Sequence, residues 1–399
     1  WDHFAKNGGT ENGDDGSFAC DHFHRFEEDL DLLVDAGFDA YRFSFSWSRL
    51  FPDGKNLNIE GLDFYKQLLD AINSRGLRPF GTAYHWDMPQ ALGQLGGWTV
   101  RENAERFGDY MGFIARTFGD GLENLVSINE PWCVAWLSHY LGEHAPGLKD
   151  LNSAASANHF VCLGHGLGVQ AARAETAKPI GIVLNFTPGR VENRSDSDIT
   201  ALERYEAVTN TWYLSAVTKG KYPHAALSEL EPLLPRNWQR DMDIIRDPID
   251  FIGINYYTTQ MLKAGGQDFP YVEIVDRNLP KTDMGWEIEP KGLADAINLV
   301  SQYAPDMPLY ITENGMASEK SISDPDRIKY YQDHLDVVAK AAQTLPIKGY
   351  FAWSLLDNFE WAFGYKKRFG LVYVDYETQQ RTKKDSFKWW QSELVRPLA

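Results

Sequence analysis

The chain has 399 residues, a formal net charge of −17 and a hydrophobic fraction of 43%, which is ample for one large core. An electrostatic field of that sign repels nucleic acid and anionic membrane surfaces, so we expect neither as a partner and favour a neutral small molecule. A run of about 18 apolar residues, the length of a membrane-spanning helix, does not occur in the sequence.

The cysteines of the chain are few and irregularly spaced. Cys20, Cys133 and Cys162 form an odd set that argues against a disulfide framework and favours a reducing compartment. Because no signal peptide is recognisable, we expect a cytoplasmic location. We also expect the amino terminus to be incomplete, so a lost signal stays open, as does assembly into a homo-oligomer.

Short apolar runs alternate with longer amphipathic runs along the whole chain. The predicted strands span 40–46, 78–84, 125–129, 180–185, 250–255, 309–313 and 349–354. The predicted helices span 20–36, 61–75, 101–118, 154–176, 199–219, 291–303, 328–344 and 386–394. This alternation is typical of βα units and a parallel sheet, so we predict an α/β fold in one domain over 1–399, a (β/α)8 TIM barrel. Residues 7–17 are expected to form a loop rather than a domain boundary.

The strand count falls one short of a closed barrel. Such a barrel has eight parallel strands, and the sequence predicts seven. The chain opens at Trp1 on what resembles a loop leading to the first predicted helix. We therefore expect the first strand to precede residue 1 and to be absent from this chain, which would leave the strands at 40–46 and 349–354 with open edges.

Two of the predicted strands end on a glutamate. Glu130 follows the run 125–129, and Glu313 follows 309–312. Alone, either residue could be a surface turn residue. In a parallel barrel, however, the carboxyl ends of all strands share one face, so the two carboxylates are expected to meet there. Paired carboxylates are the machinery of glycoside hydrolysis.

Other strand ends carry polar or aromatic side chains to the same face. They include Arg42 within the first run, His85-Trp86-Asp87 after the second, Asn255 with Tyr257 after the fifth, and Trp353 in the last. Each has a simpler interpretation: Arg42 as a structural ion pair, His85 as a core histidine, Trp86 as core. The repetition at every strand end favours a site.

Six ordered segments give the chain a resemblance to glycoside hydrolase family one, the β-glucosidase family, over essentially its whole length. They read YRFSFSWSR at 41–49, YHWDMPQAL at 84–92, SINEPW at 127–132, GINYYT at 253–258, ITENG at 311–315 and WSLLDNFEWAFGYKKRFGLVYVD at 353–375. The resemblance implies a single (β/α)8 barrel and a retaining two-glutamate mechanism without metal or cofactor. It also implies a first strand, carrying a sugar-binding Gln, upstream of Trp1; whether that strand is truly missing or only omitted stays open.

The resemblance assigns roles residue by residue. It implies that Glu130 is the general acid/base and Glu313 the nucleophile, about 5–5.5 Å apart as retention requires. Arg42, Asn255 and Tyr257 would support the nucleophile. The implied sugar-binding residues are His85, Asn129, Trp132, Trp353, Glu360, Trp361 and Phe369.

The expected substrates are unphosphorylated. The carboxylate of Glu360 would repel a sugar phosphate, so the resemblance implies terminal β-D-glucosyl residues of short β-glucosides and cello-oligosaccharides, with β-galactosides or β-fucosides also accepted. Two alternatives remain. One is a sugar-binding but inactive barrel, if the first strand is missing. The other is a transglycosylating β-glycosidase, in which an alcohol replaces water.

Overall fold

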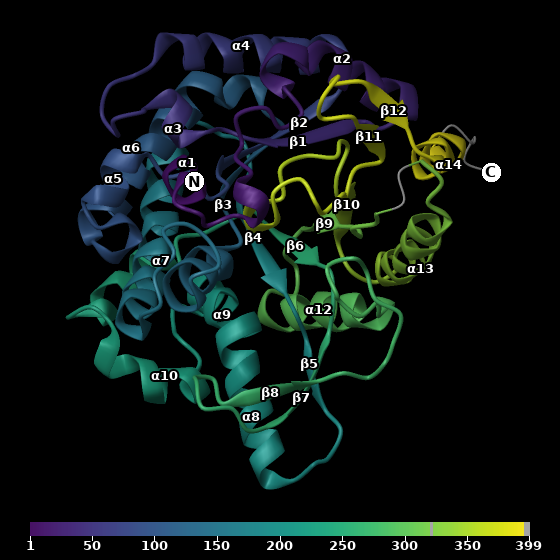
Figure 1. The fold of residues 1–399 in the computed structure, drawn as a ribbon. Coiled ribbons are helices and arrows are strands. Elements are labelled where there is room, and N and C mark those ends of the chain that lie inside the picture. The colour runs from purple at the N-terminus through teal and green to yellow at the C-terminus, as the bar shows by residue number, and fades with distance from the viewer. Residues whose placement is uncertain (320–321, 395–399) are drawn as a thin grey trace.

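A sheet of seven parallel strands forms the centre of the computed structural model, which describes residues 1–319 and 322–394. The strands follow the spatial order β1-β2-β3-β4-β6-β9-β10 and curl into a nearly closed barrel surrounded by helices (Figure 1). Their bounds are β1 Ala40–Ser44, β2 Arg78–Tyr84, β3 Asn124–Asn129, β4 Ile180–Phe186, β6 Phe251–Tyr256, β9 Leu309–Asn314 and β10 Ile347–Ala352. The predicted α/β barrel and all seven predicted strands are confirmed.

Helices connect successive strands and cover the outside of the barrel (Figure 1). The longer ones are α2 His22–Ala36, α4 Ile59–Ser74, α6 Arg101–Phe118, α7 Leu151–Arg173, α8 Asp196–Glu206, α9 Trp212–Lys219, α12 Pro290–Tyr303, α13 Pro325–Ala341 and α14 Asp385–Leu394. Short helices are α1 Asp2–Lys6, α3 Trp47–Leu50, α5 Gln90–Gln94, α10 His224–Leu230 and α11 Met242–Ile245. In the part of the chain that the structure describes, no helix is long and apolar enough to cross a membrane.

The inner strands of the barrel are buried on both faces, which explains their nearly continuous apolar sequences. All six residues of β3 are buried, as are all six of β6. Outside the barrel, α6 and α7 pack closely because α6 carries glycines at the contact. A Cβ on Gly108 would lie 3.1 Å from the Cβ of Leu167, and one on Gly112 would lie 3.2 Å from that of Ala171.

Several elements differ from the sequence-based expectation. The helix predicted over 199–219 is divided into α8 and α9 by a π-helical turn, η5, at Ala207–Thr211. A short 3₁₀ turn, Glu11–Gly13, lies inside the predicted loop 7–17. Two small sheets were not predicted: β5 Gly189–Val191 with β7 Gln260–Ala264 and β8 Val272–Val275, and β11 Val372–Val374 with β12 Arg381–Lys383. Strands of three to five residues are too short to display a readable alternation.

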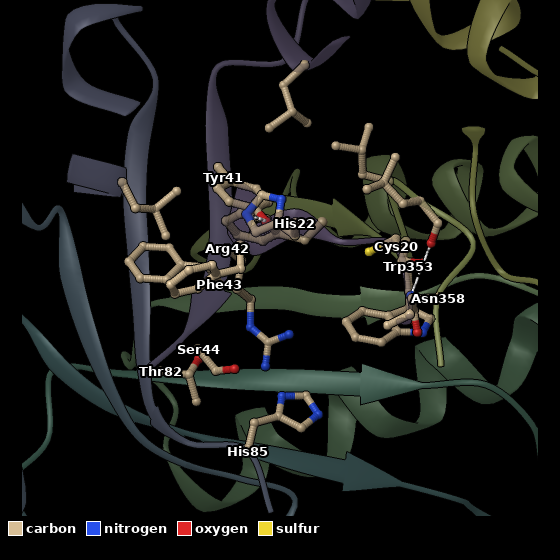
Figure 2. Close-up of a pocket in the computed structure, with 18 of the residues that line it drawn as sticks. Cys20, His22, Tyr41, Arg42, Phe43, Ser44, Thr82, His85, Trp353 and Asn358 are labelled. Atoms are coloured by element: carbon tan, nitrogen blue, oxygen red, sulfur yellow. Dashed lines mark hydrogen bonds between the residues drawn. The ribbon is translucent and has the colours of Figure 1, made fainter. Parts of the chain in front are cut away.

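The two edge strands of the barrel sheet, β1 and β10, flank a cavity of about 580 Å³. β1 pairs with β2 on one side and β10 with β9. Figure 2 shows this cavity, into which Arg42 and His85 extend, with Trp353 also on its wall. The open edges predicted for the first and last strands are therefore present in the described residues, and the cavity between them reaches side chains of the predicted site.

Candidate active site

Glu130 stands at the point where β3 ends and a π-helical segment, η4 (Cys133–Leu141), is about to begin. Its backbone has a φ of 50°, in the left-handed region that non-glycine residues seldom adopt. The conformation is held by hydrogen bonds at both ends of the residue. The Glu130 N–H donates to the Val183 carbonyl at 2.9 Å, and the Val134 N–H donates to the Glu130 carbonyl at 3.3 Å. The left-handed turn at Glu130 is therefore part of the site.

Glu313 lies within β9 and is held by a cation and a phenol. Arg42 Nη1 lies 2.8 Å from Glu313 Oε1 in an ion pair whose side chains are only 7% and 5% exposed. The Tyr257 hydroxyl donates to Glu313 Oε2 at 2.8 Å. Both donors stabilise the ionised carboxylate, and each fixes one of its oxygens.

Asn255 contacts the other carboxylate. Its Nδ2 donates to Glu130 Oε1 at 2.6 Å, and its Oδ1 accepts a hydrogen bond from Thr312 Oγ1 at 2.7 Å, which orients the amide. The sequence-based expectation grouped Asn255 with the supports of Glu313. The contacts correct this: the register of β6 and β9 pairs Asn255 with Glu313, but the side-chain amide donates to Glu130.

Asn129 links the two halves of the site. Its Oδ1 accepts hydrogen bonds from Arg42 Nη2 at 2.6 Å and from Asn255 Nδ2 at 3.1 Å. Its Nδ2 donates to His85 Nε2 at 3.3 Å. The backbone carbonyl of Asn129 accepts from Trp86 Nε1 at 2.9 Å. The fully buried side chain of Asn129 is therefore hydrogen-bonded to residues from β1, from the segment after β2, and from β6.

The two glutamates have different electrostatic surroundings. Burial, reinforced by the nearby charge of Glu313, raises the pKa of Glu130 to about 7. Glu130 has neutral hydrogen-bond partners in Asn255 and Cys133, whereas Glu313 has a guanidinium. Glu130 is thus suited to carry a proton near neutral pH, and Glu313 to carry a charge.

All predicted site residues except Arg42 and Asn129 line one cavity of about 480 Å³. Its walls are largely aromatic. His85 lies with its ring 6.1 Å from that of Trp353 and 5.9 Å from that of Trp361, centroid to centroid. Trp132 and Phe369 also line the cavity, and Phe369 packs 6.0 Å from Tyr257. The carboxylates are therefore enclosed by the flat apolar surfaces that suit the C–H faces of a sugar.

Two polar groups in this cavity are held in their neutral forms. Burial, reinforced by the charges of Glu313 and Glu130, raises the pKa of Glu360 to about 8. Burial, reinforced by Arg42, lowers the pKa of His85 to about 3. At neutral pH both are therefore uncharged hydrogen-bonding groups, which is appropriate for binding hydroxyls.

Sequence reasoning missed some contacting residues. Cys133 donates from Sγ to Glu130 Oε2 at 3.0 Å, and Thr312 orients Asn255. Helical spacing of three residues after Glu130 could have indicated Cys133. The sequence carries no comparable sign for Thr312. Among the described residues, no group of three or more His, Cys, Asp or Glu side chains is placed to hold a metal ion.

A parallel barrel with two buried glutamates in different hydrogen-bonding surroundings at its carboxyl-end face is the arrangement of a glycoside hydrolase. Sequence comparison agrees, and the chain belongs to glycosyl hydrolase family 1, whose sequence model matches residues 1–396.

Similar proteins lie within this family. The chain is 42% identical to Beta-glucosidase A of Thermotoga maritima over 98% of its own length and 90% of that protein's. It is 42% identical to a bifunctional beta-D-glucosidase/beta-D-fucosidase of Bifidobacterium breve, over 98% and 91% of the two lengths. The solved Thermotoga maritima beta-glucosidase in complex with deoxynojirimycin superposes with a TM-score of 0.95 at 41% identity, covering 99% of this chain and 91% of that one.

Proposed function

We propose that this chain is a retaining β-glucosidase that releases terminal non-reducing β-D-glucosyl residues from short β-glucosides and cello-oligosaccharides. The observation that carries the proposal is that two buried carboxyl groups have different hydrogen-bond partners. Glu313 is paired with Arg42 and Tyr257, while Glu130 has only neutral donors and a pKa raised to about 7. A nucleophile needs the first environment and an acid needs the second.

The reaction we propose begins with attack by a Glu313 oxygen on the anomeric carbon. The bond from that carbon to the glycosidic oxygen breaks, and Glu130 transfers its proton to the departing oxygen. In the second step Glu130, now ionised, takes a proton from water, whose oxygen attacks the anomeric carbon and releases Glu313. Water and two carboxyl groups balance both steps, so the mechanism requires no cofactor.

The electrostatics support this change of role at Glu130. In the free site, the charge of Glu313 raises the pKa of Glu130 and keeps the acid protonated. Formation of the glycosyl ester removes that charge. The pKa of Glu130 then falls, which favours the ionised form that the second step needs as a base.

The surrounding residues support a neutral hexoside as substrate. We propose that His85, Glu360 and Trp361 bind sugar hydroxyls, and that Trp353 lies against the ring. Glu360 supplies no positive charge to a phosphate and would repel one in its ionised form, which disfavours phosphorylated sugars. Asn129 stands next to the acid, where a hydrogen bond to the 2-hydroxyl strengthens in the transition state. The names of the Thermotoga and Bifidobacterium relatives support β-glucosides, with β-fucosides as a second substrate class.

We further propose that the chain is one catalytic domain and that it works in the cytoplasm. The match of the family over 1–396 supports one catalytic domain. The free thiols Cys20, Cys133 and Cys162 suit a reducing compartment such as the cytoplasm.

The deciding experiment is hydrolysis of p-nitrophenyl β-D-glucoside by the purified chain, with Glu313→Ala as control. We expect turnover that disappears in the variant, and NMR should show the β-anomer of glucose as the first product. An α-anomer would overturn the retaining mechanism. A folded chain without turnover that still binds deoxynojirimycin would instead indicate the sugar-binding alternative, and glucoside products formed from added alcohol would indicate transglycosylation.

A further inference from the structure

The carboxyl group of Glu130 is held by one donor on each oxygen. Asn255 Nδ2 donates to Oε1 at 2.6 Å, and Cys133 Sγ lies 3.0 Å from Oε2. Cys133 is 6% exposed and Glu130 is also 6% exposed, so water does not readily replace either contact. A thiol has one hydrogen to donate and a carboxylate can only accept, which makes Cys133 the donor.

The position of Cys133 is set by the fold rather than by side-chain freedom. It is the first residue of η4, directly after the left-handed turn at Glu130. Its carbonyl accepts a hydrogen bond from Ser138 Oγ at 3.2 Å, and the Val134 N–H is bonded to the Glu130 carbonyl. The backbone therefore holds the thiol against Oε2 through the same turn that presents the carboxyl group.

We propose that Cys133 is a positioning residue for the acid/base Glu130, whose thiol fixes the orientation of the carboxyl group and sets the balance between its protonated and ionised forms. This inference rests on the acid/base role assigned to Glu130 above. The thiol suits this role because it is a weak hydrogen-bond donor. A strong donor on Oε2 would favour the ionised form and weaken the acid, whereas an apolar side chain would leave Oε2 without a partner and weaken the base.

The thiol itself does not titrate in the working range. Burial, reinforced by the charge of Glu130, holds the pKa of Cys133 well above its ordinary value, so it remains a donor. The charged or titratable groups that also face this pair are Glu313, Arg42, Glu143, Tyr213, Tyr257 and Glu360. The Cys133 variants below leave these groups unchanged, so a shift in the pH dependence reports the thiol contact.

The test compares Cys133→Ala with Cys133→Ser and with Cys162→Ala. Cys162 is a matched control because it is a second buried free thiol, located in α7 beside Tyr222. The specificity constant kcat/KM is measured as a function of pH for p-nitrophenyl β-D-glucoside and for cellobiose. We expect Cys133→Ala to lower kcat/KM for cellobiose roughly three- to tenfold, with a smaller loss on the activated substrate, since only the poor leaving group depends on a well-aimed proton.

The pH dependence of kcat/KM distinguishes this role from a purely structural one, which would leave that dependence unchanged. Loss of a donor to the ionised carboxylate raises the pKa of Glu130. The alkaline limb of the pH profile, where kcat/KM declines as Glu130 loses its proton, should therefore move to higher pH in Cys133→Ala. In Cys133→Ser the limb should lie at or below the wild-type position, because a hydroxyl is the stronger donor. Cys162→Ala should keep the wild-type limb.

Results that contradict the role of Cys133 can be told apart from results that contradict the β-glucosidase proposal. If the wild type does not turn over either substrate, the β-glucosidase proposal fails first. If the wild type is active and the limb of Cys133→Ala does not move, or if equal losses occur on both substrates, the positioning role is overturned. Cys133→Val, which fills the space without a donor, replaces the alanine variant if that variant does not fold. A Cys133→Ser limb above the wild-type pH also overturns the inference.

Discussion

Arg42 Nη1 and Glu313 Oε1 lie 2.8 Å apart, although 271 residues separate them in the sequence. The second guanidinium nitrogen, Nη2, lies 2.6 Å from Asn129 Oδ1. One planar group therefore holds the proposed nucleophile and the amide beside the proposed acid in a fixed relation. The ammonium of a lysine could not make both contacts in this geometry.

The two contacts of the Arg42 guanidinium lead to a prediction for Arg42→Lys. We expect kcat/KM to fall by roughly 100-fold, because Glu313 loses its alignment while its charge stays compensated. Arg277→Lys is a matched control, since Arg277 also pairs with two glutamates, Glu287 and Glu289, and none of the three lines the cavity of the site. Steady-state kinetics of the two variants decide the matter, and equal losses would mean that Arg42 has only a structural role.

Removal of the proposed nucleophile should leave a site that an external anion can complete. We expect Glu313→Ala to lose on the order of 10⁴-fold or more in kcat. Azide, placed where the carboxylate was, should then attack an activated β-glucoside such as 2,4-dinitrophenyl β-D-glucoside, displace the phenolate and give the α-glucosyl azide. Glu206→Gln, which changes a buried glutamate outside the carboxylate pair, should keep most of the activity. Full activity of Glu313→Ala would refute the nucleophile assignment.

Removal of the proposed acid should depend on the leaving group. We expect Glu130→Ala to slow cellobiose hydrolysis by roughly 10²–10⁴-fold, the contribution of a general acid. p-Nitrophenyl β-D-glucoside should lose less in its first step, because a good leaving group needs little protonation. The comparison requires the rate of the first step, measured by the burst of nitrophenol. Equal losses on both substrates would argue against an acid role.

The pKa of Glu130 predicts a pH limit for activity. Its value of about 7 means that the free site loses its acid proton as pH rises through neutrality. We expect kcat/KM to decline on the alkaline side with an apparent pKa near 7. Glu130→Gln should lack this limb on activated substrates. A wild-type plateau extending well above that pH would show that the group is not the acid.

Glu360 should make the fold less stable as pH rises. Its pKa of about 8 lies above the ordinary value of 4.5, so between these values the folded chain binds more protons than the unfolded chain. The free energy of unfolding therefore decreases with rising pH across that window. Glu360→Gln, which cannot ionise, should gain stability relative to the wild type at pH values above the window and little below it. Urea unfolding at both extremes checks the sign, and a constant difference between the two proteins would refute it.

The sequence was sufficient for the barrel and for the location of the site. Strands such as β3 and β9 are buried on both faces, so they appear as apolar runs that end where a polar residue must face the opening. Glu130 and Glu313 occupy those positions, and the parallel arrangement brings them to one face. Short elements such as β5 and β11 escaped prediction because three residues show no periodicity.

Side-chain partners could not be read in the same way. Asn255 lies near the end of its strand in a pattern that fits support for either glutamate. The register of β6 and β9 pairs it with Glu313, yet its amide donates to Glu130, 125 residues earlier. The donor role of Cys133 likewise depends on the left-handed turn at Glu130, which apolar patterning does not encode.

The sequence by itself determined the α/β barrel, its seven strands and the face on which two glutamates meet, because hydrophobic periodicity and strand order are properties of the chain. The resemblance already paired Arg42 with Glu313, and the tertiary structure decided that Asn255 and Cys133 are the neutral donors to Glu130. That division depends on burial and on contacts of a few ångströms between distant residues, and it is what separates a proposed nucleophile from a proposed acid.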